Sequence, residues 1–166
     1  MQWEKDKGLS VLFVCLGNIC RSPMAEGAFR SAALKAGLDV KVASVGTAGY
    51  HIGDPPDPRA IEVARRHGVD IAGNRGRQLA ESDFSAFTHI FALDTANLAG
   101  INARSPRHHG AHISLLLDVF DGSRGESVAD PYYGDADDFA DCWDQITRAS
   151  AELAKQLTRE TGTFAA

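Results

Sequence analysis

The sequence has no excess of basic residues. Its 17 Lys and Arg residues are outnumbered by 22 Asp and Glu residues, and the formal net charge of the 166-residue chain is -5. An acidic chain has no overall basic surface to attract nucleic acid or an anionic membrane over a long distance. We therefore expect neither partner, and any anion site has to be built locally from a few groups.

Long apolar runs are also absent. No stretch approaches the roughly 20 apolar residues that span a bilayer, and the first eight residues, MQWEKDKG, contain no apolar core of the kind found in a secretory leader. These absences predict a protein that does not enter a membrane, and we expect a cytoplasmic location.

Cysteine is scarce. The three cysteines, Cys15, Cys20 and Cys142, are an odd number at irregular spacing, which fits neither a disulfide framework nor a zinc ribbon. We expect free thiols in a reducing compartment, so their reactivity becomes the relevant question. For Cys142, on the apolar side of an expected helix, we expect a place in the core.

Metal-binding patterns are weak. Three histidines, His108, His109 and His112, come near to metal-ligand spacing, but they fall in an expected polar loop without a carboxylate or cysteine nearby. We expect no metal ion and no cofactor.

Repeats, low-complexity tracts and linkers are missing too, and the length suits one domain. We expect a single domain over residues 1–166, with mobile ends at 1–7 and 161–166. What the chain does contain is an alternation of apolar runs and helical patterns. The run from Leu9 to Cys15 is short and almost wholly apolar, as in a parallel strand buried on both faces.

The remaining patterns predict an α/β fold. Strands are expected at 40–45, 89–93 and 111–117, and helices at 59–67, at 95–104 and from Asp135 onward. Another helix should follow the first strand, with Ser22 as its N-cap and Pro23 in its first position. This order implies right-handed crossovers. The fold class is then a three-layer sandwich, a central parallel sheet of about four strands with helices on both faces.

The segment between the first strand and this helix carries the chemistry. It reads CLGNICRS at residues 15–22, so that Cys15 and Arg21 bracket five residues at a helix N-terminus. A tight loop there can turn successive N–H groups toward an anion, and the helix dipole adds positive potential. Gly17 and Asn18 tolerate the left-handed backbone that such a loop needs. Arg21 can bind two phosphate oxygens with its planar guanidinium.

The same field favours a thiolate at Cys15, and the Ser22 hydroxyl could hydrogen-bond to it. Each residue also has a plainer interpretation: Cys15 as an apolar strand end, Arg21 as a surface charge and Ser22 as a helix cap only. Placement at a strand-to-helix turn favours the functional interpretation. For Cys20, packing and a redox role both remain open.

If the Cys15 thiolate attacks a phosphate ester bound in this loop, an acid is also needed to protonate the leaving oxygen. Asp130 begins the sequence DPYY in a Gly- and Asp-rich loop between the last expected strand and the last helix. In a parallel sheet this loop lies at the same edge as Cys15, so Asp130 can reach the site. An ordinary Asp-Pro turn is the alternative.

Together these motifs resemble the low-molecular-weight protein tyrosine phosphatases. The segment VLFVCLGNICRSP at 11–23 is similar to the family's phosphate loop, and DPYYG at 130–134 is similar to its general-acid motif. Between them, the segments at 44–47, 53–59, 77–79 and 93–98 match in order. The resemblance implies hydrolysis of phosphotyrosine and aryl phosphate monoesters through a phosphocysteine intermediate. Its substrates would be tyrosine-phosphorylated proteins, and the enzyme a monomer or weak dimer.

The resemblance also implies roles for individual residues. Cys15 would be the nucleophile, Arg21 the phosphate clamp and Asp130 the acid and then the base. The substrate-binding residues would be Leu16, Gly17, Asn18, Ile19, Cys20 and Ser22 in the loop, with Tyr50, Tyr132 and Tyr133 as the walls of the slot. Loop support would come from Ser44, Asn74 and Asp94.

For two of these supporting residues, the role is not simply taken from the family pattern. Many members have a histidine where this sequence has Asn74, whose amide can hydrogen-bond to Asn18 but cannot carry a positive charge. For Asp94 we expect a cap on the following helix in preference to a direct substrate role.

Two other function classes remain as alternatives. Some arsenate reductases share the fold and the loop but relay a disulfide through extra cysteines, and residues 78–97 contain none. A binding module without activity would need the loop and Arg21 but neither Cys15 nor Asp130. The sequence therefore favours the phosphatase.

Overall fold

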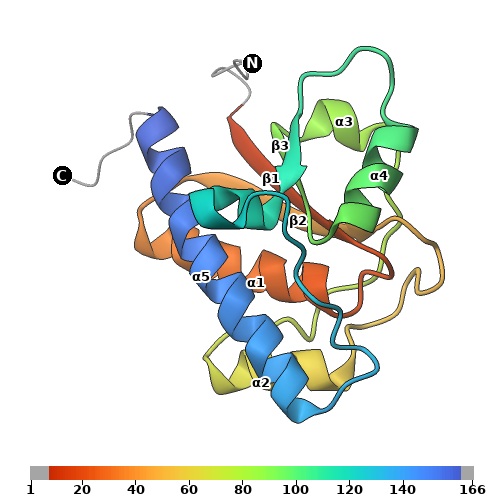
Figure 1. Cartoon of the computed structure of the whole chain (residues 1–166), viewed down its shortest axis with the longest axis vertical. Helices are drawn as coiled ribbons and strands as arrows, with labels where there is room; N and C mark the ends of the chain where they lie inside the picture. The colour runs from red at the N-terminus through yellow and green to blue at the C-terminus, as the bar shows by residue number, and fades with distance from the viewer. Residues whose placement is uncertain (1–7, 162–166) are drawn as a thin grey trace.

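A computed structural model describes residues 8–161. The elements in chain order are β1 (Leu9–Cys15), α1 (Arg21–Lys35), β2 (Val40–Gly46), α2 (Pro58–Arg66), α3 (Asp83–Ala86), β3 (His89–Ala92), α4 (Thr95–Arg104), β4 (His112–Leu115), the 3-10 helices η2 (Leu116–Val119) and η3 (Asp121–Ser123), and α5 (Ala136–Thr161). Figure 1 shows their arrangement. The predicted mobile ends lie outside the described residues except for Thr161, which ends α5.

The four strands form one parallel sheet in the order β2-β1-β3-β4. This confirms the predicted α/β class, and β1 is an inner strand, as its apolar run predicts. Its register pairs Cys15 with Gly46 at the carboxyl end of β2. Because all strands point the same way, the loops that follow β1, β2 and β3 meet at one edge of the sheet.

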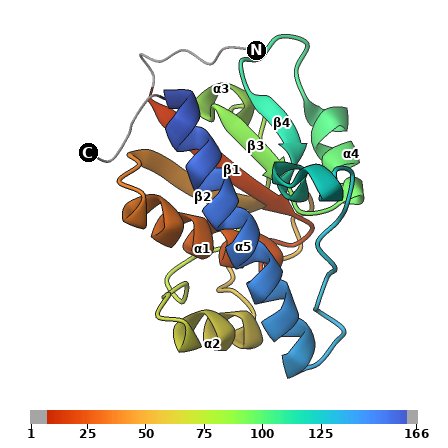
Figure 2. The same ribbon diagram turned by 60° about the vertical axis from the view of Figure 1, so that its left-hand side comes forward.

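Helices cover both faces of the sheet. Figure 2 shows α5 crossing in front of the sheet with α3 behind it. The side chains of β1 alternate between two apolar clusters: Val11 and Phe13 belong to the one that includes α1 and α5, whereas Leu12 and Val14 face α3 and α4. All four are fully buried, so β1 is packed on both faces.

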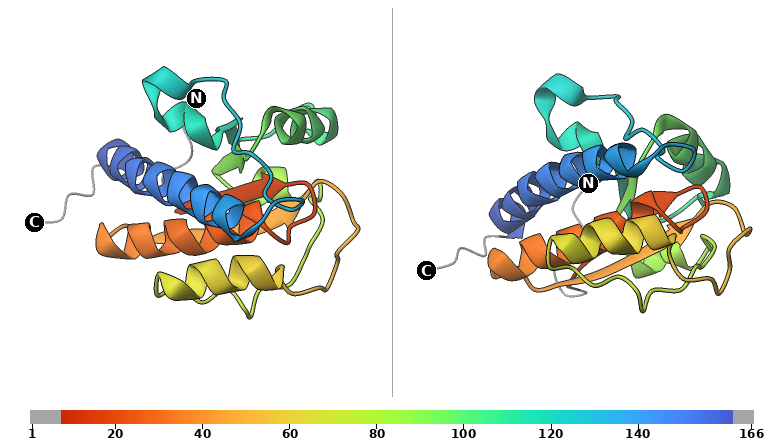
Figure 3. Two further views of the ribbon diagram at one scale, coloured as in Figure 1. Left: turned by 60° about the horizontal axis from the view of Figure 1, so that its bottom comes forward. Right: turned by 90° about the horizontal axis from the view of Figure 1, so that it is seen from below.

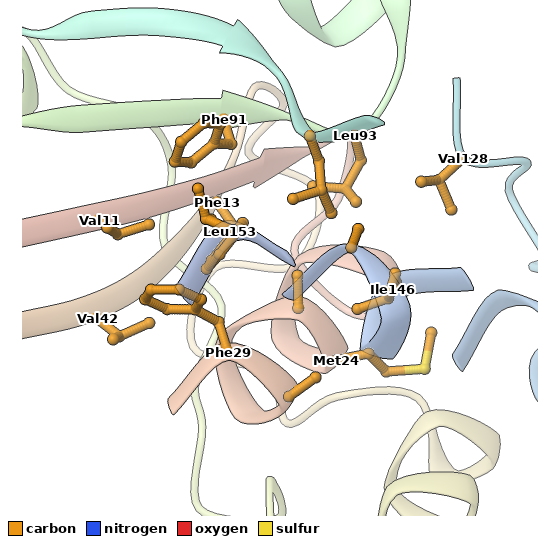
Figure 4. Close-up of a cluster of buried hydrophobic side chains, with 14 of the residues drawn as sticks. Val11, Phe13, Met24, Phe29, Val42, Phe91, Leu93, Val128, Ile146 and Leu153 are labelled. Carbon is orange, nitrogen blue, oxygen red and sulfur yellow. The ribbon is translucent and has the colours of Figure 1, made fainter. Parts of the chain in front are cut away.

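The larger cluster fixes α1 and α5 against the sheet. In Figure 4 the rings of Phe13, Phe29 and Phe91 lie together with Leu153 of α5 close by, and the Phe13 and Phe29 ring centroids are 5.6 Å apart. Burying an aromatic side chain of this kind contributes on the order of 2 kcal/mol. This packing fixes α1 against the sheet, and with it the first turn of α1, which follows the loop at residues 16–20.

Helix α2 packs beside α1 and α5 instead of directly on the sheet (Figure 3). Asp57 caps it by accepting a 2.8 Å hydrogen bond from the Arg59 N–H, and Pro58 occupies its first turn. No helix within residues 8–161 has the length and apolarity to cross a bilayer.

Three local predictions need correction. Helix α1 begins at Arg21 with Cys20 at its N-cap, so Ser22 lies inside the helix and is not the cap. Strand β4 ends at Leu115, because the next residues turn into the 3-10 helix η2, which buries Leu116 and Leu117. The one-turn helix α3 was not predicted, since four residues are too few to show a helical period.

His89 is a buried histidine at the start of β3. Its ring stacks on Phe91 at 6.0 Å, its Nδ1 lies 2.9 Å from the Thr88 hydroxyl, and its Nε2 lies 3.8 Å from a carboxylate oxygen of Glu160. Burial, with a smaller contribution from His112, lowers the pKa of His89 from 6.5 to about 4.

We expect this histidine to make stability depend on pH. The His89 side chain takes up its proton below about pH 6.5 in the unfolded chain but only near pH 4 in the folded chain. The free energy of unfolding should therefore fall by up to about 3 kcal/mol as the pH is lowered through this range. Urea unfolding at pH 7, 5.5 and 4.5 measures the loss. His89→Gln should lose less stability over the same range, and equal losses in both proteins would show that other groups cause the dependence.

Candidate active site

The phosphate loop, residues 16–20, joins β1 to α1. Two of its carbonyls bond outward, since Leu16 O accepts from Ala48 N at 2.9 Å and Ile19 O from Asp57 N at 2.8 Å. Within residues 8–161 the five N–H groups of this loop donate to no protein acceptor. Asn18 has a φ of 58°, the left-handed backbone that lets the chain curl at this point. The loop is therefore a nest of unpaired donors at a helix N-terminus.

Gly46 allows this loop to lie against β2. A Cβ at this position would lie 2.7 Å from the carbonyl oxygen of Leu16 and 3.1 Å from the backbone nitrogen of Asn18. Any side chain there would push the loop outward. Gly17, by contrast, does not have a positive φ, so only Asn18 uses the left-handed conformation that both residue types tolerate.

Cys15 lies at the floor of the loop and is buried. Its Sγ is 2.9 Å from the Ser22 hydroxyl, which also accepts a 2.8 Å hydrogen bond from Asn18 Nδ2. The one hydrogen of this hydroxyl can point to the Val45 carbonyl at 3.3 Å or to the sulfur, and a thiolate is the stronger acceptor of the two. Although Ser22 is not the helix cap, it occupies the position beside the sulfur that the sequence predicts.

Asn18 holds the loop by three hydrogen bonds from its side chain. Besides Ser22, its Nδ2 donates to the Ser44 hydroxyl at 3.0 Å, and its Oδ1 accepts from the Arg77 N–H at 3.0 Å. The predicted support from Asn74 is wrong, because Asn74 makes no hydrogen bond to Asn18 and its buried Nδ2 has no partner within the described part of the chain.

Glu26 extends this network. It is nearly buried and accepts from the Ser44 hydroxyl at 2.7 Å and from Arg30 at 2.8 Å. The cysteine is thus connected through two serines and an asparagine to the buried carboxylate of Glu26, whose partner Arg30 is exposed on α1. The sequence offers little signal for Glu26, since a glutamate in a helix followed four residues later by an arginine is typical of an exposed pair.

Arg21 is buried in the first turn of α1, with 3% of its side chain exposed. Its Nη1 donates to Asp94 at 2.7 Å and to the Val128 carbonyl at 2.9 Å. Burial opposes the charge, but the negative potential of Cys15 and the hydrogen bond to Asp94 outweigh it and hold the pKa of Arg21 above its usual value. Asp94 also caps α4 as predicted, accepting a 2.6 Å hydrogen bond from Asn97 N.

Asp130 lies across the site from Cys15, in the acid loop, residues 129–134. One carboxylate oxygen accepts a 3.1 Å hydrogen bond from Tyr132 N, and the other is 3.6 Å from Arg21 Nη2. The side chain is 42% exposed, so it can reach a ligand and still exchange protons with water.

These groups surround one pocket of about 230 Å³. Most of the predicted site residues line it, whereas Asn18 and Ser22 lie buried behind it, and His51 is a lining residue that the sequence did not point out. The full lining is Cys15, Leu16, Gly17, Ile19, Cys20, Arg21, Tyr50, His51, Asp130, Tyr132 and Tyr133.

The other two thiols are buried. Burial raises the pKa of Cys20 well above its ordinary value, and the nearby Asp57 carboxylate acts in the same direction. Burial raises the pKa of Cys142 to about 12. Both belong to the larger apolar cluster, so Cys142 lies in the core as predicted and Cys20 packs there too.

Metal-ligating side chains do not gather near the site. Between residues 8 and 161 no group of three or more His, Cys, Asp or Glu residues is arranged to hold a metal ion. His109 accepts from Ala111 N at 3.2 Å, and the His112 ring lies 5.7 Å from His89. Two of the three histidines near position 110 therefore have structural contacts.

Comparisons with known proteins agree with this geometry. A profile of the low molecular weight phosphotyrosine protein phosphatases matches residues 10–163. The chain belongs to this family. The phosphatase of that name from Schizosaccharomyces pombe is 42% identical over 154 residues, 91% of this chain and 98% of the relative. The human protein of that name is 39% identical over 142 residues, 84% of this chain and 89% of the relative.

The solved structure of YfkJ from Bacillus subtilis superposes with a TM-score of 0.83 at 39% identity, covering 92% of this chain and 96% of that one. The predicted family and fold are confirmed. For this low molecular weight phosphatase, the residues that sequence reasoning missed are Glu26, Gly46 and His51. Glu26 hydrogen-bonds to Ser44 and Gly46 lies against the Leu16 carbonyl, both far away in the chain, whereas His51 lines the pocket.

Glu26 provides a test of the buried network. Glu26→Ala leaves the Ser44 hydroxyl without its acceptor and Arg30 with the Val42 carbonyl alone, so we expect a loss of about 1 to 3 kcal/mol in the free energy of unfolding. The control is Glu62, which pairs with two arginines on the exposed side of α2, Arg65 at 2.6 Å and Arg66 at 3.2 Å. Glu62→Ala should cost clearly less than Glu26→Ala, because water screens an exposed pair. Urea titrations compare the two variants, and equal losses would contradict a structural role for the buried Glu26 carboxylate.

Proposed function

We propose that this protein hydrolyses phosphotyrosine in proteins, and aryl phosphate monoesters, through a phosphocysteine intermediate on Cys15. The observation that carries the proposal is one pocket in which the Cys15 sulfur, the unpaired N–H groups of the phosphate loop and the Arg21 guanidinium share a floor, with Asp130 at its side. Such a floor fits a tetrahedral dianion, and Cys15 supplies a nucleophile on the same floor.

The reaction then takes two steps. The Cys15 thiolate attacks phosphorus, the bond from phosphorus to the ester oxygen breaks, and Asp130 gives its proton to the departing oxygen. Water next attacks the phosphocysteine, Asp130 takes a proton from it, and the sulfur leaves as thiolate with inorganic phosphate as the product. Through both steps the N–H groups and Arg21 stabilise charge on the equatorial oxygens. Ser22 donates to the sulfur whenever it is a thiolate.

The rim of the pocket supports an aryl substrate carried on a protein. Among residues 8–161, six large apolar side chains are exposed, and Leu34 is the one with no place near the site. Four of the other five line the pocket, namely Leu16, Tyr50, Tyr132 and Tyr133. The fifth, Ile52, follows the lining residue His51 in the sequence. Tyr132 and Tyr133 meet edge to face with centroids 4.9 Å apart. Exposed apolar patches of this kind are typical of interaction surfaces.

Further properties belong to the same proposal. Residues 1–166 act as one domain, without a metal ion or cofactor, because Arg21 and the N–H groups supply the positive potential. A cytoplasmic location is supported by three free thiols, as kept in a reducing compartment. We infer a monomer or weak dimer that acts on tyrosine-phosphorylated proteins and binds neither nucleic acid nor membrane.

The nucleophile is tested by Cys15→Ser. We expect turnover of p-nitrophenyl phosphate to fall below about a thousandth of wild type, with binding of inorganic phosphate retained because the N–H groups and Arg21 remain. The control is Cys142→Ser, a change at another buried thiol, which should leave turnover near wild type. Higher residual activity in Cys15→Ser would exclude the covalent route, and thiol-dependent arsenate reduction by wild type would favour the reductase.

The acid is tested by the leaving group. Asp130→Asn should slow phosphoenzyme formation by about 10²- to 10⁴-fold for phenyl phosphate, whose leaving oxygen is strongly basic, and far less for p-nitrophenyl phosphate. Single-turnover kinetics measure that step. An equal loss for both substrates would mean that Asp130 only shapes the loop.

A further inference from the structure

Arg59 connects helix α2 to the acid loop. Its Nη2 donates to the Tyr132 carbonyl at 2.9 Å and its Nη1 to the Gly134 carbonyl at 3.2 Å. The guanidinium also lies over two rings, with its central carbon 4.5 Å from the Phe139 centroid and 5.7 Å from that of Tyr132. In Figure 1 the start of α2 lies beside the start of α5, where these partners are found.

Asp57 holds this arginine in place and connects it to the phosphate loop. The Arg59 Nε and Nη2 donate to the two Asp57 carboxylate oxygens at 3.0 and 2.9 Å. The Asp57 N–H in turn donates to the Ile19 carbonyl at 2.8 Å. The hydrogen bond from Arg59 lowers the pKa of Asp57, although burial opposes it. A continuous chain of contacts thus runs from the phosphate loop through Asp57 and Arg59 to the acid loop.

Apart from the buried Pro131 and the hydrogen bonds of Val128, which precedes it, the acid loop has little other support. Within residues 8–161, the two hydrogen bonds from Arg59 are the only ones that join the backbone of 129–134 to another element. The Asp130 contact with Arg21, at 3.6 Å, is longer than a hydrogen bond. A second cavity, of about 570 Å³, lies between this loop and α5 and is lined by Pro131, Cys142 and Arg148 among others. Packing from that side is therefore incomplete.

We propose that Arg59, oriented by Asp57, is a positioning residue that sets Asp130 over the phosphate loop. The proposal rests on the proposed function, in which Asp130 is the general acid. An arginine suits the role because its planar group reaches a carboxylate and two carbonyls at once, whereas a lysine has one nitrogen for all three. Displacement of a catalytic group by about 1 Å can cost about 10²-fold in rate.

The first experiment compares Arg59→Met with Arg65→Met, a change at an exposed arginine of the same helix that pairs with Glu62. Arg59→Met should slow single-turnover phosphoenzyme formation from phenyl phosphate by about ten- to a hundredfold, and from p-nitrophenyl phosphate much less. Inhibition by inorganic phosphate should not change, because Arg21 and the N–H groups remain. Arg65→Met should match wild type. Arg59→Lys should recover only part of the loss.

The second experiment is a double-mutant cycle. If Arg59 acts through Asp130, adding Arg59→Met to Asp130→Asn should slow phenyl phosphate little further. A multiplied loss in the double variant, or an equal loss for both substrates in Arg59→Met, would overturn the positioning role. Thermal unfolding of each variant checks that the loss does not come from unfolded protein, and a fall in rate that tracks the unfolded fraction would count against the proposal.

The same measurements separate this proposal from the one beneath it. If Asp130→Asn leaves phenyl phosphate turnover intact, the acid role fails and the positioning role fails with it. If Asp130→Asn gives the expected selective loss while Arg59→Met behaves like Arg65→Met, the positioning role alone fails. A selective loss in both, without further loss in the double variant, supports both proposals.

Discussion

The five unpaired N–H groups of the phosphate loop are the constraint around which this protein is arranged. Backbone donors without a partner cost free energy away from water, on the order of 1 to 3 kcal/mol each when fully buried, and a chain relaxes to pair them where it can. The loop keeps them open because two of its carbonyls and the Asn18 side chain are tied outward. Binding of a phosphate dianion then satisfies donors that the fold leaves unsatisfied.

The second requirement concerns the buried arginine of the site. Its positive charge lies close to the positive potential of the N–H groups, so it needs negative partners of its own. Arg21 loses its water but gains the Asp94 carboxylate, the Val128 carbonyl and the nearby sulfur. Asp94 serves both Arg21 and the N-terminus of α4, so one carboxylate balances the charge and fixes a helix. Breaking a buried pair of this kind is costly because it leaves an uncompensated charge.

Prediction from sequence succeeded where the determining contacts are local. The apolar run of β1, the Gly and Asn of the loop at 16–20 and the cap at Asp94 are each visible as a pattern within a few residues of the chain. It failed where the partner is distant: Asn74 makes no hydrogen bond to Asn18, and Arg77 N takes the place assigned to it. Glu26 escaped notice because nothing in a helical pattern distinguishes a buried glutamate that binds Ser44 from an exposed one.

The two halves of the site are built with different stiffness. The phosphate loop lies between an inner strand and a helix in the core, and its side-chain network is buried. The acid loop is partly exposed and borders a cavity, and within residues 8–161 its backbone hydrogen-bonds to another element through Arg59 alone. A phosphate must be held in one geometry through both chemical steps, but the acid must leave room for an alcohol to depart and for water to enter. A rigid anion site facing a lightly tethered carboxylate meets both demands within one fold.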